Sequence, residues 1–266
     1  MRLRVGDVEV AAYEAEPELD VRVGPRPYLH PVRTLGGVPV TDTLPEDHPW
    51  HLGVSVAMAE VNGVNLWGGR TYVRDVGYTW LDDHGQIVHT GWLPAGDGFA
   101  EELAWLGPAG DTLLTERRAV AAAPAPVGWQ LSFRYALTAT GEVTLGSPAT
   151  NGRPDGAGYG GFFWRATAGP AHAFTAGQDG EQKVNGSAEP WVAVTVGQAY
   201  TLVFQGLAGA DRWFVRTGEY VGVCAALAFS ETLTIPAGGT LERQLTVLVA
   251  DGALTRDRIQ AALSGG

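Results

Sequence analysis

The stretch GWQLSFRYAL, residues 128–137, alternates apolar and polar side chains along its whole length. Trp129, Leu131 and Phe133 fall on one face, and small or polar residues fall on the other. Such a period of two predicts a β-strand with one buried face. The same pattern predicts strands in three further segments: VEVAAYEAE (8–16), YTLVFQGLA (200–208) and LERQLTVLVADG (241–252).

Turn sequences rich in glycine, asparagine and aspartate separate these strands at short intervals, as in VNGVN (61–65) and NGRPDGAG (151–158). Short strands at this spacing are typical of antiparallel sheets. One segment, TRDRIQAALS (255–264), predicts a helix with Thr255 as its N-cap. We therefore expect one all-β domain over residues 1–266: a large two-sheet antiparallel β-sandwich with a short C-terminal helix. The supersandwich of galactose-mutarotase-like proteins is one form that it could take.

The composition narrows the classes of partner. The formal charge of −11 disfavours nucleic acid and anionic membranes, which are bound through lysine and arginine. No apolar run approaches the length of about 18 residues that a membrane span needs. Cys224 is the only cysteine and lies in the apolar run VGVCAALAF, which predicts a small core residue. We expect a soluble cytoplasmic protein that takes a small-molecule ligand; a homo-oligomer stays open.

Histidines are concentrated in the first third of the chain. Five of the six lie between positions 30 and 89, and EDHPWHLG (46–53) holds two of them three residues apart. In a strand, His48 and His51 would point to opposite faces, but in a loop or a turn that starts at Pro49 both rings can converge. Since imidazole titrates near neutral pH, such a cluster is a candidate for proton transfer. We name His48, His51, His30 and His89 as candidate catalytic residues; His84 and His172 are expected to be solvated.

Other polar and aromatic side chains complete the predicted site. Asp47 is the candidate that orients a histidine through its ring N–H; an Asx-turn is the alternative. Trp50 and Trp67 are expected to stack on a sugar ring, and Asn65, Arg70 and Arg165 to bind its hydroxyls. No cofactor is predicted. If a divalent metal is bound, His30, His48, His51 and His89 are the expected ligands.

Several motifs resemble a bacterial family labelled "methane oxygenase PmoA". The matching segments are RPYLHP (26–31), DHPWHLG (47–53), NGVNLWG (62–68), GQIVH (85–89) and YGGFFWR (159–165). Family members often carry histidine at the position of Trp50 and arginine at that of Leu52. The resemblance adds Arg26, Tyr28 and Tyr159 to the expected substrate-binding residues. Similar proteins look like partners of sugar oxidoreductases, which implies a carbohydrate context. The chain has no membrane span, so we do not expect a methane monooxygenase.

Two classes of function follow. In the first, the protein is an enzyme that acts on a sugar, a glycoside or an oxidised (keto) sugar through histidine acid/base chemistry, as a lyase, hydrolase or epimerase. In the second, it is a non-catalytic carbohydrate-binding or accessory protein of a sugar-catabolic pathway. The clustered titratable groups favour the enzyme, because a binding module has little use for them.

Overall fold

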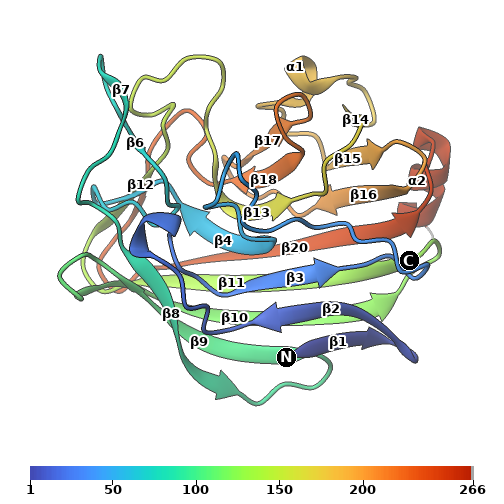
Figure 1. The fold of residues 1–266 in the computed structure, drawn as a ribbon, viewed down its shortest axis with the longest axis horizontal. Coiled ribbons are helices and arrows are strands. Elements are labelled where there is room, and N and C mark those ends of the chain that lie inside the picture. Colours follow the sequence, from blue (N-terminus) through green and yellow to red (C-terminus); the bar gives the residue numbers. More distant parts are fainter. Residues whose placement is uncertain (265–266) are drawn as a thin grey trace.

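The strand expected at residues 128–137 is part of β11 (Trp129–Ala139), which lies inside an eight-stranded antiparallel sheet of this computed structural model. The structure describes residues 1–264. Figure 1 shows the long strands of this sheet running side by side across the molecule. In spatial order its strands are β14 (Ala171–Phe174), β15 (Trp191–Val196), β16 (Tyr200–Gln205), β20 (Thr240–Asp251), β11, β10 (Thr112–Pro124), β9 (Phe99–Leu106) and β8 (Gln86–Leu93).

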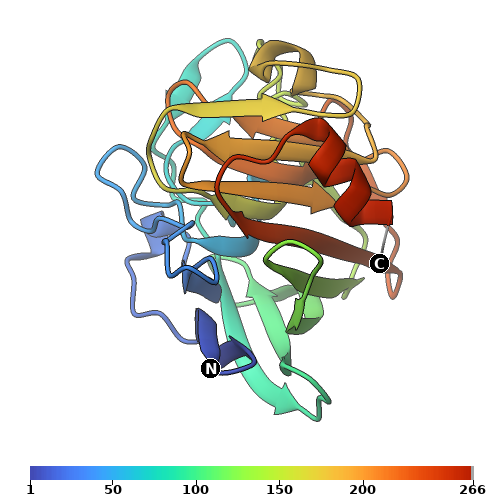
Figure 2. The same ribbon diagram turned by 90° about the vertical axis from the view of Figure 1, so that its right-hand side faces the viewer.

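A seven-stranded antiparallel sheet packs against the first, so the expected two-sheet sandwich is confirmed (Figure 2). The remaining described strands form two small sheets, one of three strands and one of two. The seven strands in spatial order are β1 (Arg2–Val5), β2 (Val8–Glu14), β3 (Tyr28–Val32), β4 (Val54–Met58), β13 (Gly160–Arg165), β18 (Gly222–Ala226) and β17 (Arg212–Arg216). The small sheets contain β5 (Glu60–Val61), β6 (Thr71–Val73), β7 (Gly77–Thr79), β12 (Val143–Gly146) and β19 (Leu233–Ile235).

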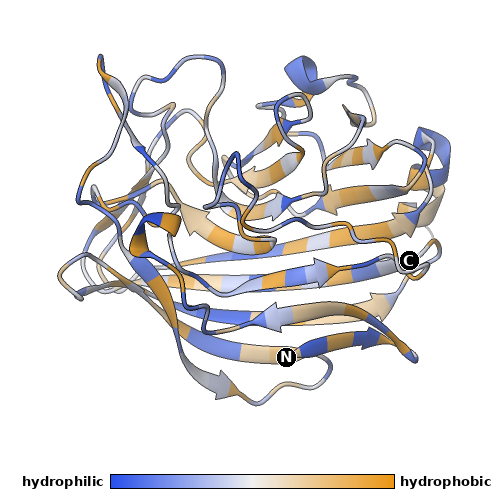
Figure 3. Cartoon of the chain, in the orientation of Figure 1, coloured by the Kyte–Doolittle hydropathy of each residue, from blue (hydrophilic) through white to orange (hydrophobic). Residues whose placement is uncertain are grey.

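The main core lies between the two large sheets. The apolar face of β11 is fully buried there, and the ring centroid of Phe133 lies 5.1 Å from that of Phe162 on β13. Figure 3 shows the resulting alternation of apolar and polar residues along the long strands. Truncating a buried aromatic side chain such as Phe133 to alanine costs about 3–5 kcal/mol. The inner face of the seven-stranded sheet packs on this core.

The outer face of the seven-stranded sheet is also buried where β4, β13, β18 and β17 meet. Successive residues point to opposite faces, so Phe162 and Trp164 enter the main core while Phe163 enters a second apolar cluster on the outside. This outer cluster contains Ala57, Trp67, Phe163, Phe214, Cys224 and Ala226. Arg165 follows Phe163 by two residues and therefore shares the outward face. Cys224 is a buried core residue, as expected, and burial raises the pKa of its thiol to about 12.

The helices are short. The expected C-terminal helix is α2 (Arg256–Ser264), and the Thr255 hydroxyl oxygen accepts a hydrogen bond of 3.4 Å from the backbone N–H of Arg258. Its buried Ile259 packs on a cluster that includes Leu248 of β20. α1 (Glu181–Val184) and the 3₁₀ turn Val21–Val23 are single turns. Within residues 1–264, none of the helices has the length and apolar character that a bilayer crossing demands.

Candidate functional site

His48 and His51 lie on the loop between β3 and β4, and this loop is not extended. The backbone N–H of His51 donates to the carbonyl of His48 (2.9 Å), and that of His48 donates to the carbonyl of Pro45 (3.1 Å). These tight turns bring both side chains to the same side of the chain. The two imidazoles stack with ring centroids 4.7 Å apart and an interplanar angle of 16°. The structure thus brings this histidine pair together.

Asp47 orients the first of the two rings. Its Oδ2 lies 2.8 Å from Nδ1 of His48. Burial opposes ionisation of this carboxyl, but the hydrogen bond from His48 and the charge of Arg165 outweigh it and lower the pKa of Asp47. An ionised carboxylate only accepts hydrogen bonds, so Nδ1 of His48 carries a proton. In its neutral form, His48 therefore has its lone pair on Nε2.

Arg165 fixes the opposite tautomer in His51. Its Nη1 lies 3.0 Å from Nδ1 of His51, and its Nη2 lies 3.3 Å from Oδ1 of Asp47. A guanidinium only donates, so Nδ1 of His51 accepts and its proton is on Nε2. His51 is only 2% exposed. Burial first, and then the charges of His48, Arg165 and Arg26, lower the pKa of His51 well below its ordinary value, so the ring is neutral at pH 7.

Aromatic rings surround the histidine pair. The ring of Tyr220, which follows β17, lies 5.0 Å from that of His48 and 4.8 Å from that of His51. The guanidinium of Arg165 lies over the same Tyr220 ring at 4.9 Å. Phe163 and Trp67 contact His51 edge-on at 4.9 and 5.8 Å. This packing holds both imidazoles in fixed orientations.

The pair forms part of the wall of a cavity of about 470 Å³. Its volume lies in the range of small-molecule sites, about 300–1,000 Å³. The cavity lies on the outer side of the seven-stranded sheet, over the outer apolar cluster. Its lining combines aromatic, basic and acidic side chains: Glu46, Asp47, His48, Pro49, Trp50, His51, Trp67, Gly68, Arg70, Tyr78, Trp80, Arg153, Tyr159, Phe214, Arg216, Glu219 and Tyr220.

Of the expected sugar-binding residues, Trp50, Trp67, Arg70 and Tyr159 line this cavity. Arg165 lies directly behind the two histidines and is almost fully buried. Its Nε has no hydrogen-bond partner among residues 1–264. Arg165 therefore acts on His51 and Asp47, and its contacts do not reach across the cavity.

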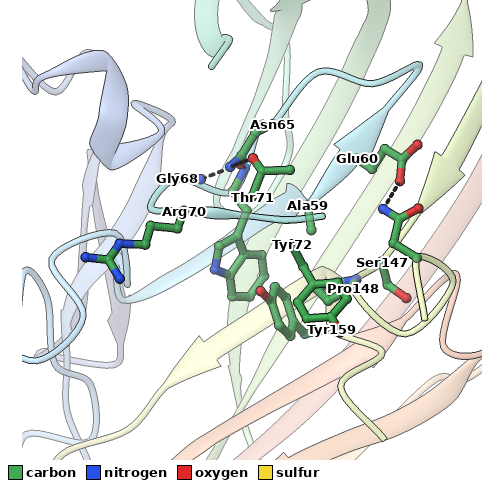
Figure 4. A pocket seen from close by; sticks show the side chains of 12 residues that line it. Ala59, Glu60, Asn65, Gly68, Arg70, Thr71, Tyr72, Ser147, Pro148 and Tyr159 are labelled. Atoms are coloured by element: carbon green, nitrogen blue, oxygen red, sulfur yellow. Dashed lines mark hydrogen bonds between the residues drawn. The ribbon is translucent and has the colours of Figure 1, made fainter. Parts of the chain in front are cut away.

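Arg26 and Asn65 shape the site from beneath. Arg26 is fully buried and donates to the carbonyls of Trp50 (2.9 Å) and Trp67 (3.0 Å), so it joins the two tryptophan loops. The side-chain oxygen of Asn65 accepts from the backbone N–H groups of Trp67 (3.0 Å) and Gly68 (2.8 Å), as Figure 4 shows in part. Neither side chain is part of the cavity wall, and the hydrogen bonds that both make here hold the tryptophan loops in place.

Three other candidates lie away from the cavity. His30 on β3 bonds to Thr41 (3.0 Å), and Tyr28, also on β3, is half-buried beside it. His89 on β8 pairs with Glu101 (2.8 Å) in a separate buried network. The four histidines named as alternative metal ligands thus do not gather at one point, and the described chain has no group of three or more His, Cys, Asp or Glu side chains arranged to hold a metal.

The expectation for His84 was wrong. This residue is buried, with Nε2 at 2.6 Å from the carbonyl of Gly69, because its turn folds back against the Asn65 loop. His172 is exposed, as expected. Several residues of the cavity wall could not be recognised from the sequence, because they lie on the short strands β7 and β17 or in loops that carry no functional motif. They are Tyr78, Trp80, Arg153, Arg216, Glu219 and Tyr220.

Comparisons with known proteins place the chain in a family but give it no activity. The model of a family described as "Family of unknown function (DUF6807)" matches residues 1–264. No curated protein sequence matches the chain. Among solved structures, the heparan sulfate lyase HepC from Pedobacter heparinus is similar with 11% identity and a TM-score of 0.35, over 82% of this chain and 30% of that one. An alpha-galactosidase from Lactobacillus brevis is similar with 8% identity and a TM-score of 0.37, over 80% of this chain and 33% of the other. The chain spans about a third of the length of these structures.

Proposed function

The chain belongs to the family of unknown function DUF6807, and from its site we propose that it is a carbohydrate-active enzyme that removes a proton from a carbon next to the carbonyl of an oxidised sugar. One observation carries this proposal: two stacked histidines on the cavity wall are held in opposite tautomers, one by Asp47 and the other by Arg165. The site therefore has a proton acceptor and a hydrogen-bond donor side by side.

His48 is the base. Its Nδ1–H bonds to the Asp47 carboxylate, so the lone pair on Nε2 is available to a substrate C–H. The carboxylate stabilises the imidazolium that forms when the proton is taken up. A positioned base of this kind contributes about 10²- to 10⁴-fold to a rate. Glu46 and Glu219 also line the cavity but have no comparable partner that orients them.

His51 is the hydrogen-bond donor to the substrate oxygen. When the C–H bond breaks, its electron pair becomes an enolate and the carbonyl oxygen gains negative charge. The neutral Nε2–H of His51 stabilises that charge, while the low pKa of the ring prevents it from competing for the proton. The enolate then has three outcomes. It regains the proton from the His48 imidazolium on the same face, which restores the carbon; it takes a proton from water on the opposite face while His48 releases its own to solvent, which inverts the carbon; or it expels an oxygen substituent at the β-carbon, which takes the proton from His48. Epimerase and lyase outcomes share this first step.

The cavity wall suits a sugar ring. Trp50 and Tyr159 supply aromatic surface at the cavity wall for the C–H side of a pyranose, and Trp67, which is almost fully buried, packs against Tyr159. The volume of about 470 Å³ holds one or two such rings. Hydrolysis of a plain glycoside fits less well, because a neutral, buried imidazole such as His51 is a poor acid. The cytoplasmic location expected from the single cysteine stays a prediction.

The proposal is tested by proton exchange, which needs no knowledge of the final product. The protein is incubated in D₂O with the methyl 2-, 3- and 4-keto-glucopyranosides, and NMR follows deuterium uptake next to the ketone. We expect uptake with at least one of the three ketones, reduced at least about 100-fold in His48→Gln. His172→Gln is the matched control and should keep the full rate, because His172 is exposed and is not part of the cavity wall.

The non-catalytic alternative rests on the same aromatic lining. It predicts that the wild-type protein binds these sugars in a calorimetric titration while no ketone exchanges faster than in buffer. In that case, or if His48→Gln exchanges as fast as the wild type, the catalytic assignment is wrong.

A further inference from the structure

Two arginines meet at one tryptophan beside the cavity. The guanidinium carbon of Arg22 lies 5.6 Å from the ring centroid of Trp80, and that of Arg70 lies 5.8 Å from it. Trp80 directly follows β7 and is 47% exposed. The backbone N–H of Gly69 donates to the carbonyl of Arg22 at 2.7 Å, which ties the two arginine-bearing segments together. The two arginines thus come from segments that are joined through the backbone, and both contact one half-exposed indole.

Neither guanidinium is occupied within the protein. In residues 1–264, every arginine side chain makes a hydrogen bond or an ion pair except those of Arg22, Arg70 and Arg258. Acidic residues outnumber basic ones by 29 to 18 in the whole chain, so a general shortage of carboxylates does not explain this. Two of the three unoccupied arginines nevertheless share one indole. Cation–π contact at an exposed site contributes only about 0.5–1 kcal/mol, which is a weak reason for one indole to hold two cations.

This cation pair lies at the edge of the candidate site. Arg70 and Trp80 both line the cavity, and Arg22 adjoins them. Figure 4 shows Arg70 pointing away from the hydrogen-bonded group formed by Asn65, Gly68 and Thr71, so its guanidinium does not serve that loop. Nearby Asp20 is engaged with the backbone N–H of Arg22 (2.8 Å), and Asp83 with the hydroxyl of Thr71 (2.6 Å).

We propose that Arg22 and Arg70, supported by Trp80, form an anion subsite at the mouth of the cavity, so that the substrate is a saccharide with an anionic substituent. The inference rests on the proposed function for the sugar ring, and it adds the chemical class of that sugar. Guanidinium forks bind carboxylate and sulfate oxygens in pairs. The negative charge of the whole chain does not prevent this, because at 0.15 M salt charges more than about 8 Å away are screened.

The test is an NMR titration that observes the arginine Nε–H signals of the intact protein. Signals are assigned with the single variants Arg22→Gln and Arg70→Gln. Three probes of matched ring are added at constant ionic strength: D-glucuronate, D-glucose 6-sulfate and D-glucose. We expect at least one anionic probe to shift the Arg22 and Arg70 signals at a concentration at least about 10-fold below that at which glucose does. Preference between the two anions distinguishes a uronate from a sulfated sugar.

Arg258 on α2 is the internal control, because its guanidinium also has no partner among residues 1–264 and it is not part of the cavity lining. The subsite is refuted if both anionic probes leave Arg22 and Arg70 unmoved, or if Arg258 shifts as much as they do. The same titration on His48→Gln separates the two proposals. If His48→Gln keeps the arginine shifts but loses proton exchange, both the anion subsite and the catalytic role of His48 are supported. If the wild type shows the arginine shifts but no proton exchange, the anion subsite is supported and the proposed enzyme activity is wrong.

Discussion

Replacing His51 by asparagine is expected to remove a specific dependence of stability on pH. The Asn side-chain oxygen can accept from Arg165 where Nδ1 of His51 now does (3.0 Å), so the local hydrogen bond is kept while the titratable group is lost. In the wild type, burial and the neighbouring cations lower the pKa of His51 well below 6.5 in the folded state. The unfolded chain keeps the ordinary value near 6.5.

The sign and size follow from proton linkage. Below pH 6.5 the unfolded chain takes up a proton that the folded protein does not, so the free energy of unfolding falls as the pH falls. For one such proton, the loss between pH 7.5 and pH 5.5 is up to about 1.4 kcal/mol. The loss caused by protonation of His51 in the unfolded chain is absent at pH values above about 7.5.

The measurement is urea unfolding of the wild type and His51→Asn at pH 7.5, 6.5 and 5.5. Taking the difference between the two proteins cancels the other titrating groups, including His30, whose pKa is also lowered by burial. The wild type should lose about 1.4 kcal/mol more than the variant across this interval. Equal slopes, or a wild type that gains stability on acidification relative to the variant, would show that His51 is not held neutral.

Three further predictions test the supporting structure. Asp47→Asn should lower proton exchange on the keto sugars about 100-fold or more with little change in stability, since Asp47 is half-exposed but sets the His48 tautomer; an unchanged rate argues against that role. Arg26→Met should cost about 3 kcal/mol in urea unfolding, because it leaves the buried carbonyls of two tryptophan loops without a donor; a cost below 1 kcal/mol would contradict this. Arg118→Met should lower the free energy of unfolding by about 3–5 kcal/mol, because buried Glu101 and Glu116 lose their counter-charge. Arg117→Met, on the exposed face of the same strand, should lower it by less than about 1 kcal/mol. Equal losses in the two variants would refute this contrast.

The architecture could be predicted from the sequence because period-two patterns directly report which face of a strand is buried. The segment at 128–137 became β11, and the helix at 255–264 formed with its expected cap. The outer apolar cluster could not be predicted in this way. Both faces of β4, β13 and β18 are buried, and such strands show a continuous apolar run that hides which residues face outward.

The site was predictable only in its local part. The spacing of His48 and His51 permitted convergence in a turn, and the turn at Pro45–His51 supplies it. Arg165 reaches the pair from a strand 114 residues later, and Tyr220 from a still more distant loop, so no short motif contains them together. His30 and His89 have the same residue type and lie in the same third of the chain, but their strands carry them to other parts of the molecule. Composition alone does not distinguish these cases.

The central claim is that His48 presents a proton-accepting nitrogen to the cavity while the neighbouring His51 presents an N–H donor to it. ¹⁵N NMR of the histidine rings at pH 7.5 tests this claim most directly. The ring nitrogen shifts and their couplings to carbon-bound protons distinguish the two neutral tautomers and the imidazolium. We predict a proton on Nδ1 of His48 and a proton on Nε2 alone for His51. A spectrum in which His51 carries its proton on Nδ1, or in which both rings share one tautomer, would contradict the account.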